Sequence, residues 1–314
     1  MPTPTPTAFF EGNYVPLEDA KIGVMTHAFN YGTAVFEGVR GNWNEDAGEL
    51  YLFRIRDHVQ RIMQSAKIVR LGLKYSEDEI VEIIENVAKK SGFREDTYFR
   101  PIVYKSEQAV GVRMHNLEED FLVYATPFGA YLDPEAGVRC ITSSWRRIDD
   151  TMIPARAKVT GLYVNNSLAK TEAELNGVDE AIMLNTDGHV SEGSGENLVM
   201  IRHGRLITPP PSDNILEGIT LETALEIAKK ELGLDVERRS IDRSELYIAD
   251  EIFLTGTAAH VTPVTEVDRI PIGDGEFGPV SRLLQQRYAD AITGRIPEYM
   301  DWLTPTYSGA AVGA

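Results

Sequence analysis

The chain has 314 residues, of which 43% are hydrophobic and 25% are charged, and this balance is that of an ordinary soluble globular protein long enough for two domains. The formal net charge of −17 argues against a nucleic-acid partner, because phosphates are bound by lysine and arginine. A Pro/Thr-rich start without a secretory pattern, no apolar run of about 18 residues and a single cysteine argue against secretion and a membrane helix, and favour a reducing, cytoplasmic compartment.

The first predicted elements are a hairpin and two helices. Residues 8–24 contain two short strand-like runs separated by a turn signal, which predicts a β-hairpin. Residues 54–70 place apolar side chains three or four positions apart, which predicts a helix with one buried face. Ser76 and Glu79 have the spacing of a capping box, which predicts the start of a second helix.

The rest of the chain contains strand-like and helix-like segments. Strands are predicted at residues 98–104, 121–125, 137–145, 180–184, 197–201 and 250–259, where residues of high β-propensity alternate or form short apolar runs. Helices are predicted at residues 164–176, 216–232 and 278–294. Residues 126–134 are rich in turn-forming residues and predict a loop.

Lys158 lies in a segment with few charges, between Pro154 and Gly161. This setting suits a strand end or a loop that enters the interior. A lysine there becomes a nucleophile because burial disfavours its ammonium form. Most lysines lie at the surface, however, and that is the default interpretation of Lys158 taken alone.

A glycine-rich segment runs from Glu192 to Asn197 and follows a turn signal at residues 186–188. Glycine allows the backbone to approach a ligand closely. Taken alone, this segment is an ordinary turn between strands. Together with Lys158, it suggests an amine that holds an aldehyde cofactor and a carboxylate, Glu192, that tunes the cofactor's ring.

Two further segments lie at the ends of predicted elements, and the first of them suits an anion. Residues 216–220 (LEGIT) open a predicted helix, whose free amides and positive dipole end attract a negative charge. Residues 256–259 (GTAA) are small residues at the end of a predicted strand, and taken alone they indicate a tight turn. Each signal is weak by itself.

Taken in order, these segments resemble those of the branched-chain amino acid aminotransferases, which are fold-type IV pyridoxal 5′-phosphate (PLP) enzymes. The resemblance extends from about Phe10 to Leu303. It rests on residues 31–40 (YGTAVFEGVR), 98–101 (YFRP), 129–131 (GAY), the segments around Lys158 and Glu192, and residues 216–220 and 256–259. It implies an α/β (α+β type) fold of two domains, like that of D-amino acid aminotransferase.

The resemblance also implies where the domains lie. A small N-terminal α/β domain would comprise residues 1–125, and an interdomain loop would follow at residues 126–134. The large C-terminal domain, residues 135–314, would carry the PLP lysine.

For the cofactor, the resemblance implies that Lys158 holds PLP and, once freed by the incoming amino acid, moves a proton between the substrate Cα and the cofactor's C4′ carbon. Glu192 would keep the pyridine nitrogen protonated, and Tyr163 would bond the ring hydroxyl oxygen. The phosphate would be held by Arg61, Ile219, Thr220 and Thr257, and the other residues expected to bind the cofactor are Leu216, Gly218 and Gly256.

For the substrate, the resemblance implies a pocket that accepts an apolar side chain and also a second carboxylate. Aromatic walls are expected from Phe36, Tyr98, Phe128 and Tyr131, a carboxylate partner from Arg40 and Arg100, and further contacts from Tyr31, Gly38, Val112, Thr257, Ala258 and Ala259. Two features depart from the family pattern. Phe128 stands where some members have tryptophan, and Arg113-Met114 replace a glycine- and proline-rich form.

The implied activity is transfer of the amino group of L-leucine, L-isoleucine or L-valine to 2-oxoglutarate. An (R)-selective amine or D-amino acid aminotransferase on the same fold is the main alternative, because single pocket contacts are worth only about 1–3 kcal/mol. A lyase acting on aminodeoxychorismate is disfavoured by residues 98–100 and 256–259. A non-enzymatic binding protein is the remaining alternative.

The expected partners are amino acids and 2-oxo acids, without nucleic acid or membrane. In the family, the loop matching residues 108–113 reaches the neighbouring subunit's active site. The resemblance therefore implies a homodimer or a higher assembly, and a hexamer is left open.

Overall fold

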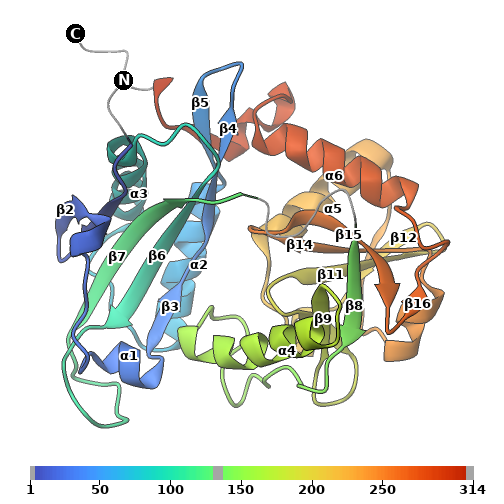
Figure 1. The fold of residues 1–314 in the computed structure, drawn as a ribbon, viewed down its shortest axis with the longest axis horizontal. Coiled ribbons are helices and arrows are strands. Elements are labelled where there is room, and N and C mark those ends of the chain that lie inside the picture. Colours follow the sequence, from blue (N-terminus) through green and yellow to red (C-terminus); the bar gives the residue numbers. More distant parts are fainter. Residues whose placement is uncertain (1–3, 130–136, 309–314) are drawn as a thin grey trace. The chain divides into compact units, whose positions relative to one another are not determined.

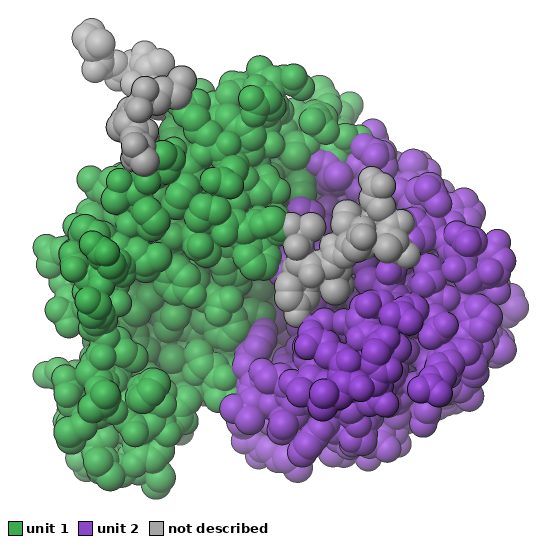
Figure 2. All heavy atoms as spheres, viewed as in Figure 1, with its two compact units in different colours: residues 1–129, 157–161, 290–314 green, residues 130–156, 162–289 purple. Residues whose placement is uncertain are grey.

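The computed structural model describes residues 4–129 and 137–308, and the chain divides into two compact units (Figure 2). Unit 1 comprises residues 1–129, 157–161 and 290–314, and unit 2 comprises residues 130–156 and 162–289. These units differ from the predicted domains in two segments, because residues 157–161, which include Lys158, and residues 290–314 belong with the N-terminal part of the chain.

Backbone pairing explains both differences. The amide of Phe36 in β3 (Ala34–Phe36) donates to the carbonyl of Lys158 over 3.0 Å, and Val159 forms a bridge with Val35. Near the C-terminus, β17 (Leu303–Pro305) pairs antiparallel with β5 (Glu49–Phe53). Such pairings join residues far apart in the sequence, so local sequence patterns do not reveal them.

The described residues of unit 1 form an eight-stranded sheet in the order β17-β5-β4-β6-β7-β1-β2, with β3 also beside β6 (Figure 1). Its other strands are β1 (Thr7–Phe10), β2 (Asn13–Pro16), β4 (Val39–Asn44), β6 (Thr97–Lys105) and β7 (Glu119–Pro127). The predicted hairpin is confirmed as β1 and β2, and the two predicted strands are confirmed as β6 and β7.

The helices of unit 1 are α1 (His27–Tyr31), α2 (Ile55–Ile68) and α3 (Glu77–Ser91). Both predicted helices are confirmed. The side chain of Ser76 accepts from the Glu79 amide, and the Glu79 carboxylate accepts from the Ser76 amide, so two amides of the first turn are satisfied. The apolar face of α3 packs on β1 and β7, and α2 packs on β3 and β6.

The two faces of this sheet differ. Along β6, fully buried residues such as Phe99 and Val103 alternate with half-buried Tyr98, Arg100 and Ile102. Successive side chains of a strand point to opposite faces. Since α2 and α3 cover one face, the three half-buried side chains lie on the other, and two of them, Tyr98 and Arg100, are predicted substrate residues.

Unit 2 contains a nine-stranded sheet of described residues in the order β10-β9-β8-β15-β14-β11-β12-β13, with β16 beside β15 (Figure 1). The strands are β8 (Val138–Thr142), β9 (Glu180–Leu184), β10 (Val190–Gly193), β11 (Asn197–Arg202), β12 (Arg205–Thr208), β13 (Val236–Arg238), β14 (Glu251–Gly256), β15 (His260–Val267) and β16 (Ile270–Pro271). The four strands predicted in this region are confirmed as β8, β9, β11 and β14.

The remaining α-helices are α4 (Tyr163–Leu175), α5 (Ile219–Leu232) and α6 (Pro279–Ile292), as predicted within a few residues. Short 3-10 helices lie at Leu17–Asp19, Thr160–Leu162, Pro211–Asp213, Arg243–Ile248 and Pro297–Trp302. Alanines of α4 pack on Ala181 and Met183 of β9, whereas Ile182 and Leu184 of the same strand enter the larger core cluster of unit 2. Successive side chains of β9 therefore pack into two different hydrophobic cores, one on each face of the strand.

In the part of the chain that the structure describes, no helix combines the length and the apolar character that crossing a membrane requires.

Candidate active site

Lys158 lies at the edge of the unit 1 sheet, and its side chain is half-buried. Its amide donates to the hydroxyl of Ser65 on α2 over 3.2 Å, and its carbonyl accepts from Phe36. The Lys158 ammonium nitrogen lies 5.0 Å from the centroid of the Phe36 ring. Backbone bonds on both sides of the residue thus hold the lysine next to an aromatic side chain of β3.

Arg100 and Tyr98 continue this arrangement along β6. The Arg100 guanidinium lies 4.4 Å from the Phe36 ring centroid, and its Nη2 donates to the Tyr98 hydroxyl over 3.0 Å. A Cβ at Gly38 would overlap the Tyr98 hydroxyl, so only glycine leaves room for this phenol. The structure therefore brings together Lys158, Phe36, Arg100, Tyr98 and Gly38, all predicted site residues.

Arg40 and Phe128 extend the same group. Arg40 of β4 is 3% exposed, its guanidinium lies 5.2 Å from the Phe128 ring centroid, and that ring lies 5.4 Å from the Tyr98 ring. Nη2 of Arg40 donates to Asp96 and to the carbonyl of Gly129. Among the described residues, the buried Nε and Nη1 of Arg40 and Nε of Arg100 have no hydrogen-bond partner. Two guanidiniums beside aromatic walls thus retain donors suited to a carboxylate.

Arg61, the predicted phosphate residue, belongs to a buried ionic cluster. Its Nε and Nη2 donate to the two carboxylate oxygens of Glu37 over 2.6 and 2.9 Å, and Nδ1–H of His58 donates to Glu37 over 2.8 Å. Burial raises the pKa of Glu37, but the charge of Arg61 and the bonds from both partners outweigh it and hold this pKa well below its usual range. Burial lowers the pKa of His58. Glu37 therefore remains ionised and fixes the Arg61 side chain.

Tyr31 and Val112 lie at the surface of unit 1. The Gly111 amide donates to the Tyr31 hydroxyl over 3.0 Å, and the ring of His27 is hydrogen-bonded to the Gly111 carbonyl over 2.7 Å. Val112 is 83% exposed. These bonds tie residues 108–112 to α1 and present both predicted substrate residues outward.

Glu192 of β10 is buried in unit 2 and is held by three donors. Its Oε1 pairs with Nη2 of Arg147 over 2.7 Å. Its Oε2 accepts from Nδ2 of Asn197 and from the amide of Leu216, both over 2.9 Å. Three hydrogen-bond donors around the Glu192 carboxylate favour its ionised form and fix its direction.

Glu196, four residues later, has a different environment. Burial, followed by the charge of Glu180, raises the pKa of Glu196 to about 8, and an amide hydrogen bond from Gly195 only partly offsets this rise. The two buried carboxyl groups of this glycine-rich segment therefore differ in environment. Glu192 pairs with Arg147, whereas burial and the neighbouring charge of Glu180 disfavour the ionised form of Glu196.

The start of α5 has features that suit a bound anion. Gly218 is the N-cap and has no side-chain cap, so amides of the first turn are left for another acceptor. A Cβ at Gly218 would overlap Oδ1 of Asn197, which explains glycine at this position. Ile219 and Thr220 follow and are buried. Leu216 precedes this start, and its amide is the one that binds Glu192.

The other predicted residues of unit 2 lie at two element ends. Tyr163 is the first residue of α4. Gly256 ends β14, Thr257 and Ala258 are half-buried in the turn before β15, and Ala259 accepts from the Thr262 hydroxyl through its carbonyl over 2.5 Å. Tyr131 lies outside the described residues.

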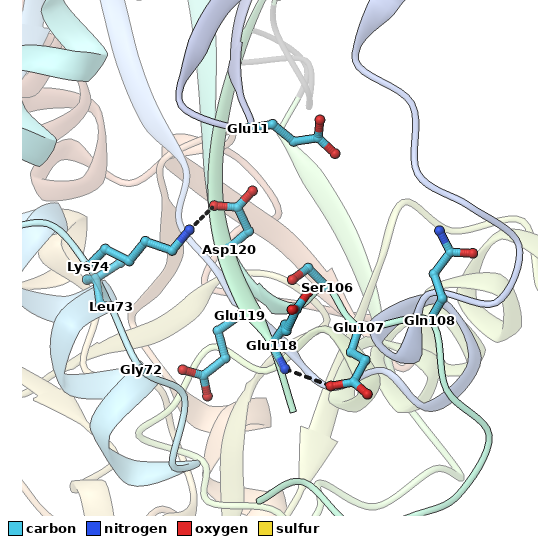
Figure 3. A pocket seen from close by; sticks show the side chains of 10 residues that line it. All are labelled: Glu11, Gly72, Leu73, Lys74, Ser106, Glu107, Gln108, Glu118, Glu119 and Asp120. Carbon is cyan, nitrogen blue, oxygen red and sulfur yellow. Dashed lines mark hydrogen bonds and ion pairs between the residues drawn. The ribbon is translucent and has the colours of Figure 1, made fainter. Parts of the chain in front are cut away.

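A separate polar pocket of 930 Å³ lies on unit 1, and none of the predicted site residues lines it (Figure 3). Five carboxylates face it, from Glu11, Glu107, Glu118, Glu119 and Asp120, and Lys74 pairs with Asp120. Within residues 4–129 and 137–308, no three His, Cys, Asp or Glu side chains are placed to hold a metal ion. The described residues that line the pocket therefore do not form a metal site.

The comparisons with known proteins give the family. The class IV amino-transferase family model matches residues 34–267. The chain belongs to the class IV aminotransferases. A probable branched-chain-amino-acid aminotransferase of Aquifex aeolicus is 50% identical over 300 residues, which cover 96% of each chain.

Solved structures agree with this assignment. A branched-chain aminotransferase of Thermoproteus uzoniensis, crystallised with norvaline, has a TM-score of 0.92 at 42% identity and covers 96% of this chain and 100% of its own. The PLP form of the enzyme from Thermobaculum terrenum has a TM-score of 0.92 at 36% identity, covering 97% and 99%. The chain is thus a fold-type IV branched-chain aminotransferase by family.

The residues of this chain fit PLP, the cofactor of this family. Lys158 of unit 1 has a half-buried amine, the kind of group that an aldehyde cofactor requires, and Glu192 of unit 2 has a buried, fixed carboxylate, the kind of group that suits a protonated ring nitrogen. The uncapped start of α5 suits the phosphate, and Gly218 gives it space that a Cβ would remove.

Several residues of these clusters were not identified from the sequence. The sequence gives one indication that Glu37 is a buried ionic residue, because it is an acidic residue within an apolar, strand-like region. For Arg147 it gives none, because its neighbour Arg146 is of the same type and yet is exposed. Only the fold distinguishes the two arginines.

Proposed function

We propose that this class IV aminotransferase moves the amino group of L-leucine, L-isoleucine or L-valine to 2-oxoglutarate, giving branched-chain 2-oxo acids and L-glutamate. The observation that carries the proposal is the group of side chains on the unit 1 sheet beside Lys158. Its aromatic walls suit an apolar side chain, and its two arginines retain donors for the second carboxylate of glutamate. The names of the relatives support branched-chain amino acids as the amino donors.

The proposed roles follow from these positions. Bound PLP supplies an electron sink for the pair of electrons left when a proton leaves the substrate Cα. Lys158 holds the cofactor and its freed amine carries that proton. Glu192 keeps a proton at the ring nitrogen, and Tyr163 bonds the ring hydroxyl oxygen.

The phosphate is assigned to a second set of residues. In the proposal, Arg61 is oriented toward the phosphate by Glu37, and the start of α5 at Ile219 and Thr220 provides amides for it. Leu216, Gly218, Gly256 and Thr257 complete the cofactor contacts. Tyr31, Val112, Ala258, Ala259 and Tyr131 are assigned to substrate.

Absorbance spectroscopy with one amino donor at a time tests the substrate proposal. The donors are L-leucine, D-alanine and (R)-1-phenylethylamine, and the readout is loss of the long-wavelength band of the bound cofactor. We expect rapid loss with L-leucine only. If the band is lost equally fast with D-alanine or the (R)-amine, the pocket accepts a broader range of donors than proposed. Phe128 is then the first residue to substitute. No response to L-leucine overturns the proposal.

We also propose that the chain acts as a homodimer or a higher assembly. Large apolar side chains are exposed on the linked segments 22–31 and 108–112 of unit 1, namely Ile22, Val24, Met25, Phe29, Tyr31, Val110 and Val112. Exposed apolar clusters of this kind commonly mark interfaces. A neighbouring copy that covers them would receive Tyr31 and Val112.

Light scattering of the purified chain tests this assembly. We expect at least twice the chain mass of 34.9 kDa, and the measured multiple decides between dimer and hexamer. Val24→Asp should lower the mass, because it places a charge in the apolar cluster. Leu175→Asp, at an equally exposed residue of α4, is the control. A fully active monomer contradicts the proposal.

A reducing, cytoplasmic compartment remains part of the proposal. Its support is Cys140 of β8, which is fully buried as a thiol, and whose pKa is raised by burial.

A further inference from the structure

Arg147 is a buried arginine in the segment after β8, and the proposed function does not use it. It is 3% exposed, whereas the preceding Arg146 is exposed. Its amide donates to the carbonyl of Leu184 over 2.8 Å, which fixes the backbone beside the end of β9. A charged side chain is rarely buried unless it is paired, so the contacts of this guanidinium indicate its role.

Each nitrogen of the Arg147 guanidinium has a partner. Nη2 pairs with Oε1 of Glu192 over 2.7 Å, Nη1 donates to Oδ1 of Asn166 over 2.8 Å, and Nε donates to the carbonyl of Asn214 over 3.1 Å. The three partners lie on β10, on α4 and after the 3-10 helix Pro211–Asp213. Asn214 has a left-handed backbone (φ 63°), which asparagine adopts more readily than most residues.

The partners of Arg147 also hold the segment that carries Glu192. Nδ2 of Asn166 donates to the carbonyl of Ser194 over 2.6 Å, two residues after Glu192. Asn166 lies three residues after Tyr163 on α4. The guanidinium therefore links the start of α4 to both the side chain and the backbone of the glycine-rich segment.

The arrangement has an electrostatic consequence. A carboxylate that faces a ring nitrogen keeps that nitrogen protonated through its negative charge. A guanidinium in contact with the same carboxylate keeps it ionised and also moderates its basicity. Arg147 thereby controls both the direction of Glu192 and the charge that acts on the ring.

We propose that Arg147 is a positioning residue that orients Glu192 and sets the charge presented to the cofactor ring. This inference rests on the proposed role of Glu192. Arg147 touches neither substrate nor cofactor in the proposal, and it acts through Glu192.

The test compares Arg147→Met, Arg147→Lys and the control Arg146→Met, each loaded with PLP. The readout is the pH at which the visible absorption band of the bound cofactor titrates. Removing a buried positive charge makes proton loss harder, so Arg147→Met should shift this pH upward by about 1 unit. Arg147→Lys retains the charge and should titrate close to wild type, and Arg146→Met should be unchanged.

Kinetics supply a second readout. Arg147→Met should lower kcat with L-leucine by about 10- to 100-fold, as for groups that orient metal ligands. Arg147→Lys should lose less activity than Arg147→Met because lysine keeps the positive charge. Recovery should be partial, because lysine cannot bond Glu192, Asn166 and Asn214 in the fixed geometry of a guanidinium. If Arg147→Met does not fold, the double variant Arg147→Met/Glu192→Gln removes both buried charges, and Arg147→Lys still tests the geometry.

The variant Glu192→Gln distinguishes the proposed role of Glu192 from the proposed role of Arg147. If Glu192→Gln leaves the spectrum and the rate unchanged, the proposed role of Glu192 fails. If Glu192→Gln changes both but Arg147→Met and Arg147→Lys behave as wild type in titration and rate, only the role of Arg147 is overturned. Equal effects of Arg147→Met and the double variant support two residues acting as one unit.

Discussion

Replacing Lys158 by alanine is expected to abolish transamination while the fold persists. The lysine side chain is half-buried beside Phe36, whereas its backbone amide and carbonyl make the bonds that hold the segment against Ser65 and β3. Alanine retains those backbone bonds and removes the amine. Because a positioned proton-transfer group alone contributes roughly 10²- to 10⁴-fold, we expect kcat/KM with L-leucine and 2-oxoglutarate to fall by at least that factor.

Chemical trapping gives an independent readout for the same residue. Borohydride reduction should fix the cofactor to a peptide that contains Lys158 in the wild-type protein, and mass spectrometry identifies that peptide. Lys67→Ala, an exposed lysine on α2, is the matched control and should behave as wild type. Trapping at a different lysine, or full activity of Lys158→Ala, rules out the assignment.

Replacing Arg100 by methionine is expected to separate the two half-reactions. Methionine retains an unbranched apolar chain but removes the guanidinium that lies on Phe36 and donates to Tyr98. Loss of a buried charged partner of a carboxylate costs about 2–4 kcal/mol, or roughly 30- to 1,000-fold in kcat/KM for L-glutamate. L-leucine has no second carboxylate, so its half-reaction should change only a few-fold.

Single-turnover absorbance with each amino acid measures this difference. Arg40→Met is the comparison, since Arg40 also lies beside the aromatic walls but is already bonded to Asp96 and the Gly129 carbonyl. A selective loss in Arg40→Met, with Arg100→Met unaffected, assigns the second carboxylate to Arg40. Equal losses for both amino acids in Arg100→Met indicate a structural role and contradict the expected one.

The glycines of the site show how sequence and structure combine. The resemblance implied that Gly38 contacts the substrate, and the structure shows that the Tyr98 hydroxyl fills the space that a Cβ at Gly38 would occupy. Gly218 likewise was a weak helix-start signal, and the structure shows the Asn197 amide group in the space its Cβ would occupy. In both cases the neighbour lies far away in the sequence, so the pattern indicated a glycine but not its reason.

The sequence by itself determined the longer helices, several of the strands and the order of the motifs. The capping box at Ser76, where α3 begins, and the apolar spacing of α2 are local features, and they depend on residues within a few positions of one another. The segments around Lys158 and Glu192 also identified the family, because the motifs occur in a fixed order along the chain.

Only the tertiary structure decided which charges are buried and with which partners. It placed Lys158 with the N-terminal unit, fixed Arg61 on Glu37, and buried Arg147 against Glu192 while Arg146 stayed exposed. The physical reason is that burial and ion pairing depend on contacts between distant segments, since a charge enters the interior only where a partner meets it. The local spacing of apolar residues predicts helices and strands. It does not identify the residues, distant in the sequence, that pair with a buried charge.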